Sequence, residues 1–531
     1  MSAPATQANS HQSAPVSGVA WHGYAAVCVL AVLFLYLLNF RDGVFFWRLS
    51  QQEGGTWIDE AFFTLQGELI YRNFFEQTPP GTVYTNTFFL WLLGPTTTAV
   101  GIIVIVMGTA CALAVYAIST AVLSGWWRYI PASIFVGLTY PSYSMLNHKW
   151  PTTLLCLLGI LAVVRVRSHL RCALSGVAHG GAMLCTQDLG LGASLGMVAA
   201  LWLLRGRKDG ADPLAFVIAC GLTGAIVMGG FGAAAGFATV WYDVVGFLFD
   251  QYGTSHTLVY GFGGWSSLPL WLTSFGLGGA GLAYALIGVA RRFWRSHAQS
   301  LVIIALAGTG LLVIGGVVHQ IEPTLFGVRA VPLTIIGVYV LQSLVEQRAA
   351  HPWPLAALIV LSAMLAAVAL SRPIRAQFTW PLLLETHRAG KMWTFGPSGP
   401  LEELTWLEAN AVEGQPVFLF PDKAGFYFLS RTRSATPYPK LFDMGFSSDA
   451  QVADAIEHLT RTCPPVGIWH RSRLFSVGNN RPELNTLRPL EDALLRDYDA
   501  VIEFPNGATA LRRKSSAPQC GSLGGAKATS S

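Results

Sequence analysis

Two adjacent carboxylates, Asp59 and Glu60, lie where a polar stretch interrupts an otherwise apolar chain. The stretch, residues 57–81, reads WIDEAFFTLQGELIYRNFFEQTPPG and carries four carboxylates and a double proline. A carboxylate at a membrane boundary can act as a general base, and the pair could hold a divalent cation, Mg²⁺ or Mn²⁺, against a phosphate. The structural alternative is that Asp59 caps a helix and complements its dipole. The spacing alone leaves both interpretations open.

Cationic side chains in later connections could meet such a phosphate. His148 and Lys149 stand at a helix end in MLNHKWPTT, where a cation either binds phosphate or only anchors the helix at the interface. Arg329 falls within an apolar segment, where a guanidinium is costly unless it is paired or functional. Its fork matches phosphate oxygens, and an ion pair with Glu322 is the alternative. His319 lies in the same connection as Glu322 and is a further phosphate candidate.

Asp188 is a candidate of a different kind, because it opens an apolar segment in CTQDLGLG. It could belong to the same polar site, as could Glu322. The alternative is that Asp188 is the N-cap of the helix that begins there. Spacing does not separate these two roles.

The composition indicates the scaffold that must hold these side chains. Of the 531 residues, 52% are hydrophobic and only 12% are charged, whereas an ordinary soluble domain carries about a quarter charged residues. We predict an α-helical polytopic membrane protein with about 11 transmembrane helices. Its net charge of +5 is scattered around the apolar segments, with no nucleic-acid signature. The predicted segments are 24–40, 97–122, 130–147, 151–165, 172–185, 188–204, 214–237, 268–290, 300–318, 325–345 and 353–371.

The sign of the charges assigns the connections to two sides. Lys and Arg gather in alternate connections, and such an excess marks the cytoplasmic side. The carboxylates, His148 and Lys149 then share the outer face, and the N-terminus is inside. Residues 85–94 are apolar but short, so we interpret them as an interfacial helix. Apolar residues at three- to four-residue spacing predict an amphipathic surface helix over 59–75, with Asp59 and Glu60 in its first turn.

Four regions follow from these patterns. We predict a disordered cytoplasmic tail over 1–23, a transmembrane domain over 24–371 with its first outer loop at 41–96, an α/β domain outside the cytoplasm over 372–514, and a disordered tail over 515–531. In the α/β domain, 416–422 and 500–504 are predicted as buried strands, 402–410 and 449–461 as helices, and 508–513 as the final strand. Cys463 and Cys520 could pair if this domain faces an oxidising compartment.

A family resemblance adds to this picture. The order of a hydrophobic helix, DEAFFTLQGELIYRNFFEQTPPG and FFLWLLG is similar to the first outer loop of GT-C glycosyltransferases. The likeness is greatest to the protein-mannosyltransferase-like and aminoarabinose-transferase-like bacterial proteins of glycosyltransferase family 39 type. QDLG at 187–190 and VFLFPDKAGFYFLSRTRSATPY at 417–438 resemble segments of the same family. Gly81 departs from the large apolar residue that usually follows the prolines, and no Lys follows closely.

The resemblance implies a hexosyl or pentosyl transferase in the inner (plasma) membrane. Its donor would be a sugar on a polyprenyl phosphate, and its acceptor a glycan, a lipid or a protein. Asp59 would take a proton from the acceptor hydroxyl, with Glu60 beside it and a metal ion held by the pair. Arg329 would contact the donor phosphate, with help from Lys149 and His148. The C-terminal domain would cover the acceptor groove or bind a partner.

Two other classes of function compete with the transferase. A transporter or flippase of a lipid-linked or polar solute usually places its ionisable groups near mid-membrane and often shows repeated halves. Here the polar groups gather at one face, and the sequence shows no internal repeat. A non-catalytic assembly scaffold would leave the outer carboxylates replaceable. We therefore favour the transferase.

Overall fold

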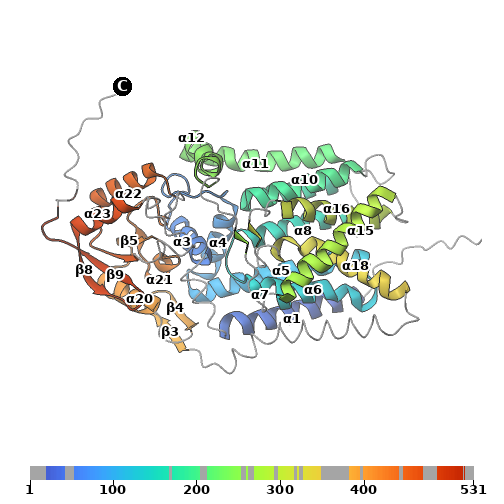
Figure 1. Cartoon of the computed structure of the whole chain (residues 1–531), viewed down its shortest axis with the longest axis horizontal. Helices are drawn as coiled ribbons and strands as arrows, with labels where there is room; N and C mark the ends of the chain where they lie inside the picture. The colour runs from blue at the N-terminus through green and yellow to red at the C-terminus, as the bar shows by residue number, and fades with distance from the viewer. Residues whose placement is uncertain are drawn as a thin grey trace, which may run out of the picture.

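The computed structural model places a bundle of long helices beside a smaller domain that contains most of the strands (Figure 1). Two short helices, α3 (Glu53–Leu65) and α4 (Gly81–Leu93), lie between the bundle and this C-terminal domain. The structure describes residues 19–41, 53–166, 170–203, 212–252, 259–260, 268–291, 297–315, 320–321, 327–347, 382–394, 399–421, 423–441, 447–470, 487–517 and 520.

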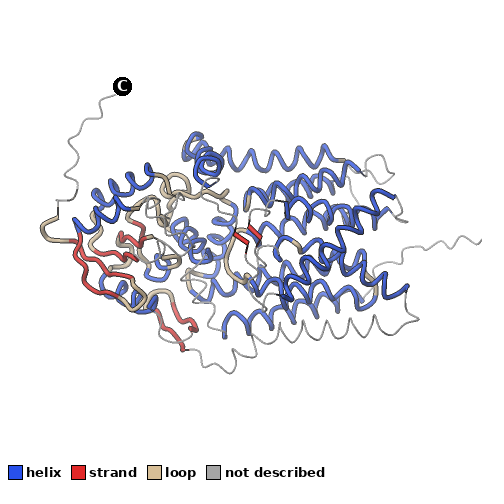
Figure 2. Tube along the Cα trace, in the orientation of Figure 1, coloured by secondary structure: helices blue, strands red, loops and turns tan. Residues whose placement is uncertain are grey.

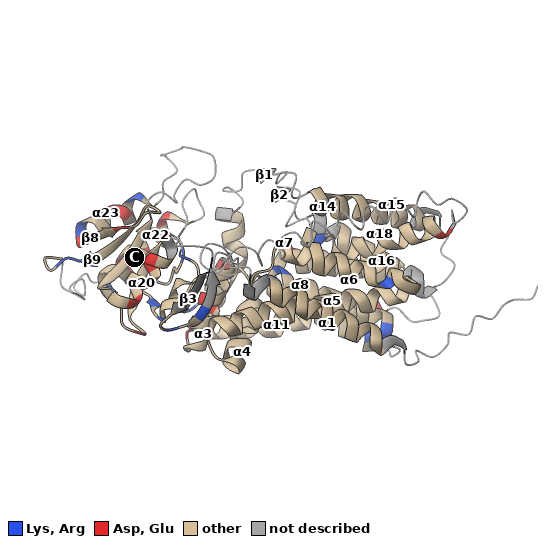
Figure 3. Ribbon diagram, turned by 90° about the horizontal axis from the view of Figure 1, so that it is seen from below, with Lys and Arg blue, Asp and Glu red and all other residues tan. Residues whose placement is uncertain are grey.

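The bundle is built from helices that follow the predicted apolar segments. α9 packs against α8, α10 and α11, while α10 packs against α16, α15 against α18, and α1 against α5. Charged residues, coloured on the ribbon of Figure 3, lie mainly in the C-terminal domain or near helix ends. The long helices are α1 (Val19–Arg41), α5 (Thr97–Val122), α8 (Lys149–Arg165), α9 (Leu170–Cys185), α10 (Gln187–Leu203), α11 (Pro213–Ala235), α15 (Gly278–Arg291), α16 (His297–Gly315) and α18 (Val331–Gln347).

Two of the described helices, α5 and α11, are long and apolar enough to cross a membrane. α5 is mostly buried within the bundle, whereas only 6% of the apolar window of α11 is buried. An apolar helix with its surface open on most sides is suited to contact with lipid. The count of about 11 crossings stays a prediction, and the predicted segment 353–371 lies outside the described residues. The two predicted disordered tails also lie mostly outside them. The exceptions are residues 19–23, which are helical, and residues 515–517 and 520.

Irregular helical pieces separate some of the long helices. The predicted segment 130–147 ends early, at residue 142, where a bend follows Pro141 and the chain runs as coil to α8. Several of these pieces contain π-type turns, which are wider than those of an α-helix. The irregular pieces are η1 (Gly125–Tyr129), α6 (Ile130–Ile134), η2 (Phe135–Thr139), α7 (Tyr140–Ser142), α12 (Phe237–Trp241), η3 (Tyr242–Gly246), η4 (Leu248–Tyr252), α14 (Leu268–Trp271) and η6 (Leu272–Leu277).

The C-terminal domain is an α/β layer, as the sequence predicted. Its five-stranded sheet has the order β6-β5-β7-β9-β8, with β5 parallel to β6 and β7, and β9 antiparallel to β7 and β8. The strands are β5 (Pro416–Phe420), β6 (Arg433–Ser434), β7 (Val466–His470), β8 (Tyr498–Glu503) and β9 (Ala508–Arg513), and the helices are α20 (Gly399–Asn410), α21 (Phe426–Ser430), α22 (Asp449–Thr462) and α23 (Arg488–Asp497).

One strand of this sheet differs from its prediction. β8, predicted over 500–504 as a buried strand, is exposed along all but its first residue. β8 lies at the edge of the sheet next to β9, so its apolar residues beyond the first are not part of the core. A separate hairpin joins β3 (Leu382–Thr386) to β4 (Gly390–Thr394), and β1 (Val259–Tyr260) pairs with β2 (Gln320–Ile321) (Figure 2).

Candidate functional site

The helix that carries the acidic pair differs from the predicted surface helix over 59–75. α3 begins at Glu53, so Asp59 is in its middle and cannot cap it. The helix ends at Leu65, because the chain turns at Gly67, whose φ of +94° suits glycine. Residues from Trp57 to Phe63 are all buried. α3 is therefore enclosed between α4, the bundle and the C-terminal domain, which explains why its acidic face is not solvated.

Asp59 caps a helix, but a helix of the other domain. The backbone N–H of Gly425 donates to Asp59 Oδ2 at 2.8 Å, and that of Phe428 donates to Oδ1 at 2.7 Å. Gly425 is the N-cap residue of α21 in the C-terminal domain, and Phe428 lies in the first turn of that helix. The first amides of a helix lack partners within it, and a carboxylate satisfies them well. Asp59 therefore links α3 to the C-terminal domain across 366 residues of sequence.

Ring contacts support the same interface. Phe62 packs edge-on against Phe428, with ring centroids 5.9 Å apart, and Phe63 packs against Tyr427 at 5.4 Å. The Arg431 guanidinium lies over Phe62, 5.1 Å from its ring centre. Aromatic pairs of this kind contribute beyond the apolar area that they bury. They hold α21 against α3 one turn after Asp59.

Glu60 points to a different set of partners. Lys440 of the C-terminal domain places its Nζ 3.3 Å from Glu60 Oε1 and 3.0 Å from Glu76 Oε2. The backbone N–H and the hydroxyl of Thr78 donate to Glu76 Oε1. Both carboxylates are completely buried. We call Glu60, Glu76 and Lys440 the interdomain cluster.

Burial and charge act differently on the members of this cluster. Burial, followed by the negative charge of Glu76, raises the pKa of Glu60 well above its ordinary value, against the opposing effect of Lys440. Burial also opposes ionisation of Glu76, but Lys440 and hydrogen bonds lower its pKa to about 2. Burial opposes the charge of Lys440 too, and the two carboxylates outweigh it and raise the pKa of Lys440. The cluster favours one carboxylate, one ammonium and one protonated carboxyl group.

A small crevice opens beside Asp59 at this interface. It has room for about one water-sized group, and it is lined by Thr56, Asp59, Ala424, Pro439 and Lys440. One side of the Asp59 carboxylate therefore faces a space that a small group could enter. The lining comes from both α3 and the C-terminal domain, so neither part forms the crevice alone.

Asp59 and Glu60 do not fit a shared metal ion in this arrangement. The oxygens of Asp59 accept backbone amides, while Glu60 faces the ammonium of Lys440. A divalent cation prefers several converging oxygen ligands, and a neighbouring ammonium repels it. Among the described residues, no three His, Cys, Asp or Glu side chains converge in a way that could hold a metal.

His148 and Lys149 lie at the start of α8 and have partners of their own. The His148 ring packs edge-on against Trp57 of α3, with ring centroids 5.0 Å apart. The Lys149 Nζ donates to the Tyr143 hydroxyl at 3.2 Å and lies 4.9 Å from the centre of the Tyr143 ring. His148 thus connects the start of α8 to the helix of Asp59.

Arg329 pairs with Asp188, at a second polar position within the bundle. Its Nη2 lies 3.2 Å from Asp188 Oδ2, and the Arg329 side chain is 8% exposed whereas that of Asp188 is 50% exposed. Asp188 is in the first turn of α10, and Arg329 lies just before α18. The predicted alternative partner, Glu322, lies outside the described residues, as does His319.

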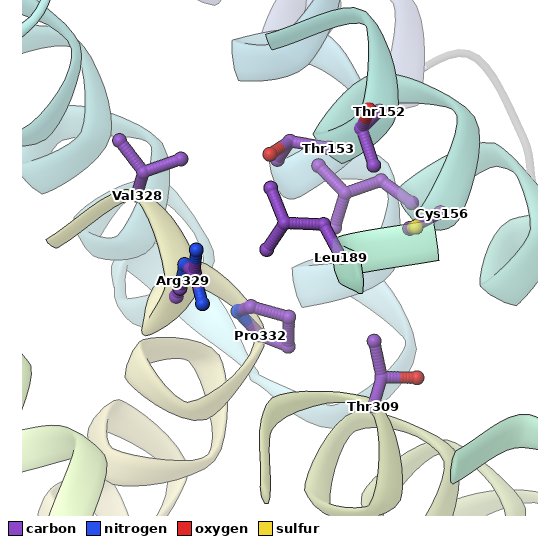
Figure 4. A pocket seen from close by; sticks show the side chains of 9 residues that line it. Thr152, Thr153, Cys156, Leu189, Thr309, Val328, Arg329 and Pro332 are labelled. Carbon is purple, nitrogen blue, oxygen red and sulfur yellow. The ribbon is translucent and has the colours of Figure 1, made fainter. Parts of the chain in front are cut away.

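Arg329 of this ion pair borders a narrow crevice between α8, α10, α16 and the start of α18. Figure 4 shows Arg329 across this space from the side chains of Thr152, Thr153 and Leu189. We call it the bundle crevice; its lining is Thr152, Thr153, Cys156, Leu157, Leu189, Thr309, Val328, Arg329 and Pro332. The wall is largely apolar, with three hydroxyl groups and one buried guanidinium.

A short chain of contacts connects the two polar positions. The Thr152 hydroxyl, in the bundle crevice, donates to the His148 carbonyl at 2.8 Å and lies 2.8 Å from the Thr186 hydroxyl. The Thr186 hydroxyl donates to the same carbonyl at 3.0 Å. Since His148 packs on Trp57, the start of α8 lies between the bundle crevice and the helix of Asp59.

The sequence interpretation missed two members of the interdomain cluster. Glu76 belongs to the acidic stretch, but no pattern distinguished it from a solvated carboxylate. Lys440 follows a proline in the C-terminal domain, 380 residues after Glu60, and no local signal marks it. Only the fold brings these side chains together.

Comparisons with known proteins add to this geometry. No protein-family model matches the sequence, and no curated protein matches it. The structure is similar to that of ArnT from Cupriavidus metallidurans bound to undecaprenyl phosphate, with a TM-score of 0.57 and 11% identity over 95% of this chain and 100% of that one. It is also similar to the oligosaccharyltransferase AglB from Archaeoglobus fulgidus in complex with an inhibitory peptide and a dolichol-phosphate, with a TM-score of 0.54 and 12% identity over 94% and 75%.

The chain has a GT-C-like fold. This confirms the resemblance predicted from the first outer loop, at the level of the fold. The apolar composition of this chain and its helices α5 and α11, which are long enough to cross a membrane, agree with a membrane location. A further structure of the Archaeoglobus fulgidus oligosaccharyltransferase, in complex with Zn and sulfate, matches with a TM-score of 0.50 and 14% identity over 83% and 67%.

Proposed function

We propose that this protein is an integral membrane glycosyltransferase that moves a hexose or pentose from a polyprenyl phosphate to an acceptor hydroxyl. The observation that carries the proposal is the likeness over 95% of this chain to a transferase bound to undecaprenyl phosphate. The second neighbour, AglB, is bound to dolichol-phosphate. Both ligands are long isoprenoid chains that end in phosphate.

The bundle crevice has the chemistry that the donor needs. Its apolar wall suits an isoprenoid chain, and its guanidinium suits a phosphate. Arg329 cannot lose its charge, so it neutralises the phosphate both in the donor and in the leaving group. Lys149 at the start of α8 and His148 are assigned as helpers, and His319 is kept as a further candidate. Asp188, which holds the guanidinium, orients the fork.

Asp59 is assigned as the base for the acceptor. It removes a proton from the acceptor hydroxyl, the oxygen attacks the anomeric carbon, and the bond from that carbon to the phosphate oxygen breaks. Polyprenyl phosphate leaves with the bonding electron pair. The crevice beside Asp59 gives the acceptor access to the carboxylate. Fixed amide donors hold the carboxylate in one orientation, which places it before the reaction begins.

The charge pattern supports an orientation in the membrane. We assign the first loop and the C-terminal domain to the side away from the cytoplasm, with the protein in the inner (plasma) membrane. Transfer on that face requires a donor that crosses the membrane with its own anchor, and a lipid carrier meets this need. The acceptor is then a glycan, a lipid or a protein of the cell envelope.

The experiment is a transfer assay with the purified protein in liposomes. Radiolabelled polyprenyl phosphate sugars of several kinds are supplied with envelope glycans, lipids and peptides as acceptors, and release of polyprenyl phosphate is measured. We expect release by the wild type and a loss of about 100-fold or more in Asp59→Asn. Asp59→Asn also loses one hydrogen bond to α21, so its domain contact is checked by limited proteolysis. Undiminished transfer by Asp59→Asn would reject Asp59 as the base.

A transporter predicts the opposite pattern in the same liposomes. The labelled lipid would move between leaflets and stay intact with every donor and acceptor. That result in the wild type would overturn the proposed transferase.

A further inference from the structure

Lys440 enters the site from the C-terminal domain, which the sequence interpretation treated only as a cover. Its side chain is 17% exposed, and its ammonium contacts the two fully buried carboxylates of the interdomain cluster. Two carboxylates this close to one another repel strongly when buried, unless a cation lies between them. Lys440 is the only cation that contacts either of them among the described residues.

The segment that carries Lys440 also holds Asp59. Gly425 and Phe428 donate their amides to Asp59, and the Phe75 amide donates to the Pro437 carbonyl at 2.8 Å. Lys440 and Asp59 both line the small crevice at the interface. Lys440 binds Glu60, and Glu60 is adjacent to Asp59 on α3. A shift of Lys440 would therefore move the C-terminal domain, with its helix α21, relative to the proposed base Asp59.

The position between Glu60 and Glu76 is one where a divalent cation would ordinarily lie. Carboxylate and hydroxyl oxygens are the ligands that Mg²⁺ and Mn²⁺ prefer, and Thr78 adds a hydroxyl bonded to Glu76. An ammonium 3.0 and 3.3 Å from the two carboxylates occupies this position. A tethered cation of this kind needs no metal to bridge the carboxylates.

We propose that Lys440 is a positioning residue of this site: its ammonium bridges Glu60 and Glu76 in the place of a metal ion and so fixes the C-terminal domain against Asp59. The effect on transfer rests on the proposed function, whereas the effect on the domain contact does not. Lys440 lines the crevice at Asp59, but its role here is to fix a position and not to take part in the chemistry of donor or acceptor. It acts through Asp59, by keeping the amides of α21 at the carboxylate.

The test measures hydrogen–deuterium exchange of the full-length protein in detergent, in the peptide that covers residues 424–430. The amides of Gly425 and Phe428 are protected by Asp59, so their exchange reports the contact directly. We expect exchange about 100-fold faster in Lys440→Met, since loss of the ammonium leaves the buried Glu76 carboxylate without its cation. Lys440→Arg retains a cation and should recover most of the protection. Unchanged exchange in Lys440→Met would overturn the proposal.

Two controls distinguish this role from misfolding and from the effect of removing any lysine of the domain. Peptides from α9 and α10 should exchange as in the wild type, which shows that the bundle is intact. Lys514→Ala removes a lysine of the same domain that contacts Leu495 and Arg496 carbonyls, and it should leave residues 424–430 protected. Faster exchange throughout the bundle in both Lys440→Met and Lys440→Arg would indicate only a folding role and would reject the proposal.

A chelator distinguishes the ammonium from a metal ion. EDTA should not change the exchange of residues 424–430 in the wild type, and added Mn²⁺ should not slow it. In Lys440→Met, Mn²⁺ alone should restore part of the protection, because Glu60 and Glu76 then lack their ammonium. If EDTA exposes the wild-type amides, a metal holds the interface and Lys440 does not.

The transfer assay tests the consequence for Asp59. We expect Lys440→Met to lower kcat by about tenfold or more, with little change in KM for the donor, since the bundle crevice is not affected. Faster exchange with unchanged kcat would contradict the positioning role of Lys440 and leave the proposed function standing. Absence of transfer in the wild type would reject the proposed function, while the exchange result would still decide the domain contact.

Discussion

Glu60 and Glu76 are fully buried between two domains, whereas Asp188, the carboxylate beside the bundle crevice, has half of its side chain exposed. The carboxylates of the interdomain cluster are held by the ammonium of Lys440 and by the backbone amide and hydroxyl of Thr78. The bundle crevice instead has one guanidinium and three hydroxyls in an otherwise apolar wall. The first arrangement fixes a geometry, and the second leaves space for a ligand. Variants of the cluster should therefore affect stability first, and variants of the crevice should affect donor binding first.

The largest effect on transfer in this comparison is expected from Arg329→Met. Loss of the guanidinium removes charge-assisted hydrogen bonds to the donor phosphate and should raise KM for the donor about 10- to 100-fold. Initial rates at varied donor concentration measure it. Arg329→Lys keeps the positive charge but loses the forked guanidinium, so its KM for the donor should lie between those of the wild type and Arg329→Met. A KM for the donor equal to that of the wild type in Arg329→Met would place the phosphate elsewhere.

The largest effect on stability is expected from Glu76→Gln. Breaking a buried ion pair by removal of one partner costs about 3 kcal/mol, so the midpoint of thermal unfolding should fall by several degrees. Tryptophan fluorescence of the protein in detergent follows the transition. Glu457→Gln is the matched control, because the Glu457–Arg461 pair is exposed on α22 and such pairs contribute only about 0–1 kcal/mol. Equal shifts in both variants would remove the distinction between the regions.

The interdomain cluster should also depend on pH in two opposite directions. The pKa of Glu76 is lowered to about 2, so its stabilisation is complete above the unfolded pKa near 4.5 and is lost as pH falls toward 2. The pKa of Glu60 is raised, so its contribution is present below about 4.5 and is lost as pH rises through the raised value. Burial and the charge of Glu76 also raise the pKa of Asp243, to about 7, and its contribution falls over a similar range.

Glu60→Gln isolates the Glu60 part of this profile. The stability of the wild type relative to Glu60→Gln should decline as pH rises above about 4.5, since the Asp243 contribution cancels in the difference. Unfolding midpoints measured from pH 4 to 8 in both proteins give this difference. A flat or rising difference would show that Glu60 is ionised in the folded protein.

The smallest effect concerns the pair Cys463 and Cys520. Burial and a hydrogen bond with the Cys520 thiol raise the pKa of Cys463 to about 11, and both cysteines are free in this structure. If the C-terminal domain faces an oxidising compartment, the neighbouring thiols should form a disulfide, with little effect on transfer. Mass spectrometry after alkylation, with and without prior reduction, detects it. Complete alkylation of both thiols without reduction would contradict the proposed orientation of the domain.

The sequence predicted the scaffold better than the site. Apolar periodicity located α5 and α11 with correct or nearly correct bounds, because burial in a bundle or in lipid depends on local composition. The same reasoning placed α3 six residues late, since the polar residues Glu53 and Thr56 gave no apolar signal at its start. From the sequence pattern alone, the buried acidic face of α3 cannot be distinguished from a face exposed to solvent.

The partners of the candidate residues depended on contacts that no local pattern contains. The alternative that Asp59 caps its own helix was wrong, because Asp59 lies in the middle of α3 and caps the helix that follows Gly425, in another domain. Arg329 was correctly expected to require a partner, and the structure supplies Asp188 from α10. Roles in transfer for Asp59, Arg329, Lys149 and His148 stay predictions.

The separation of 366 residues between Asp59 and its amide partner has a consequence for biogenesis. Asp59 and the helix that it caps cannot meet until the ribosome has made α21. At about 5–20 residues per second, this delay lasts roughly 20–70 s after α3 is made. During that time the carboxylates of the first loop must stay hydrated, because no protein group can yet compensate their burial. The Asp59 contact therefore forms only when the C-terminal domain docks, and a chain truncated before residue 425 could not make it.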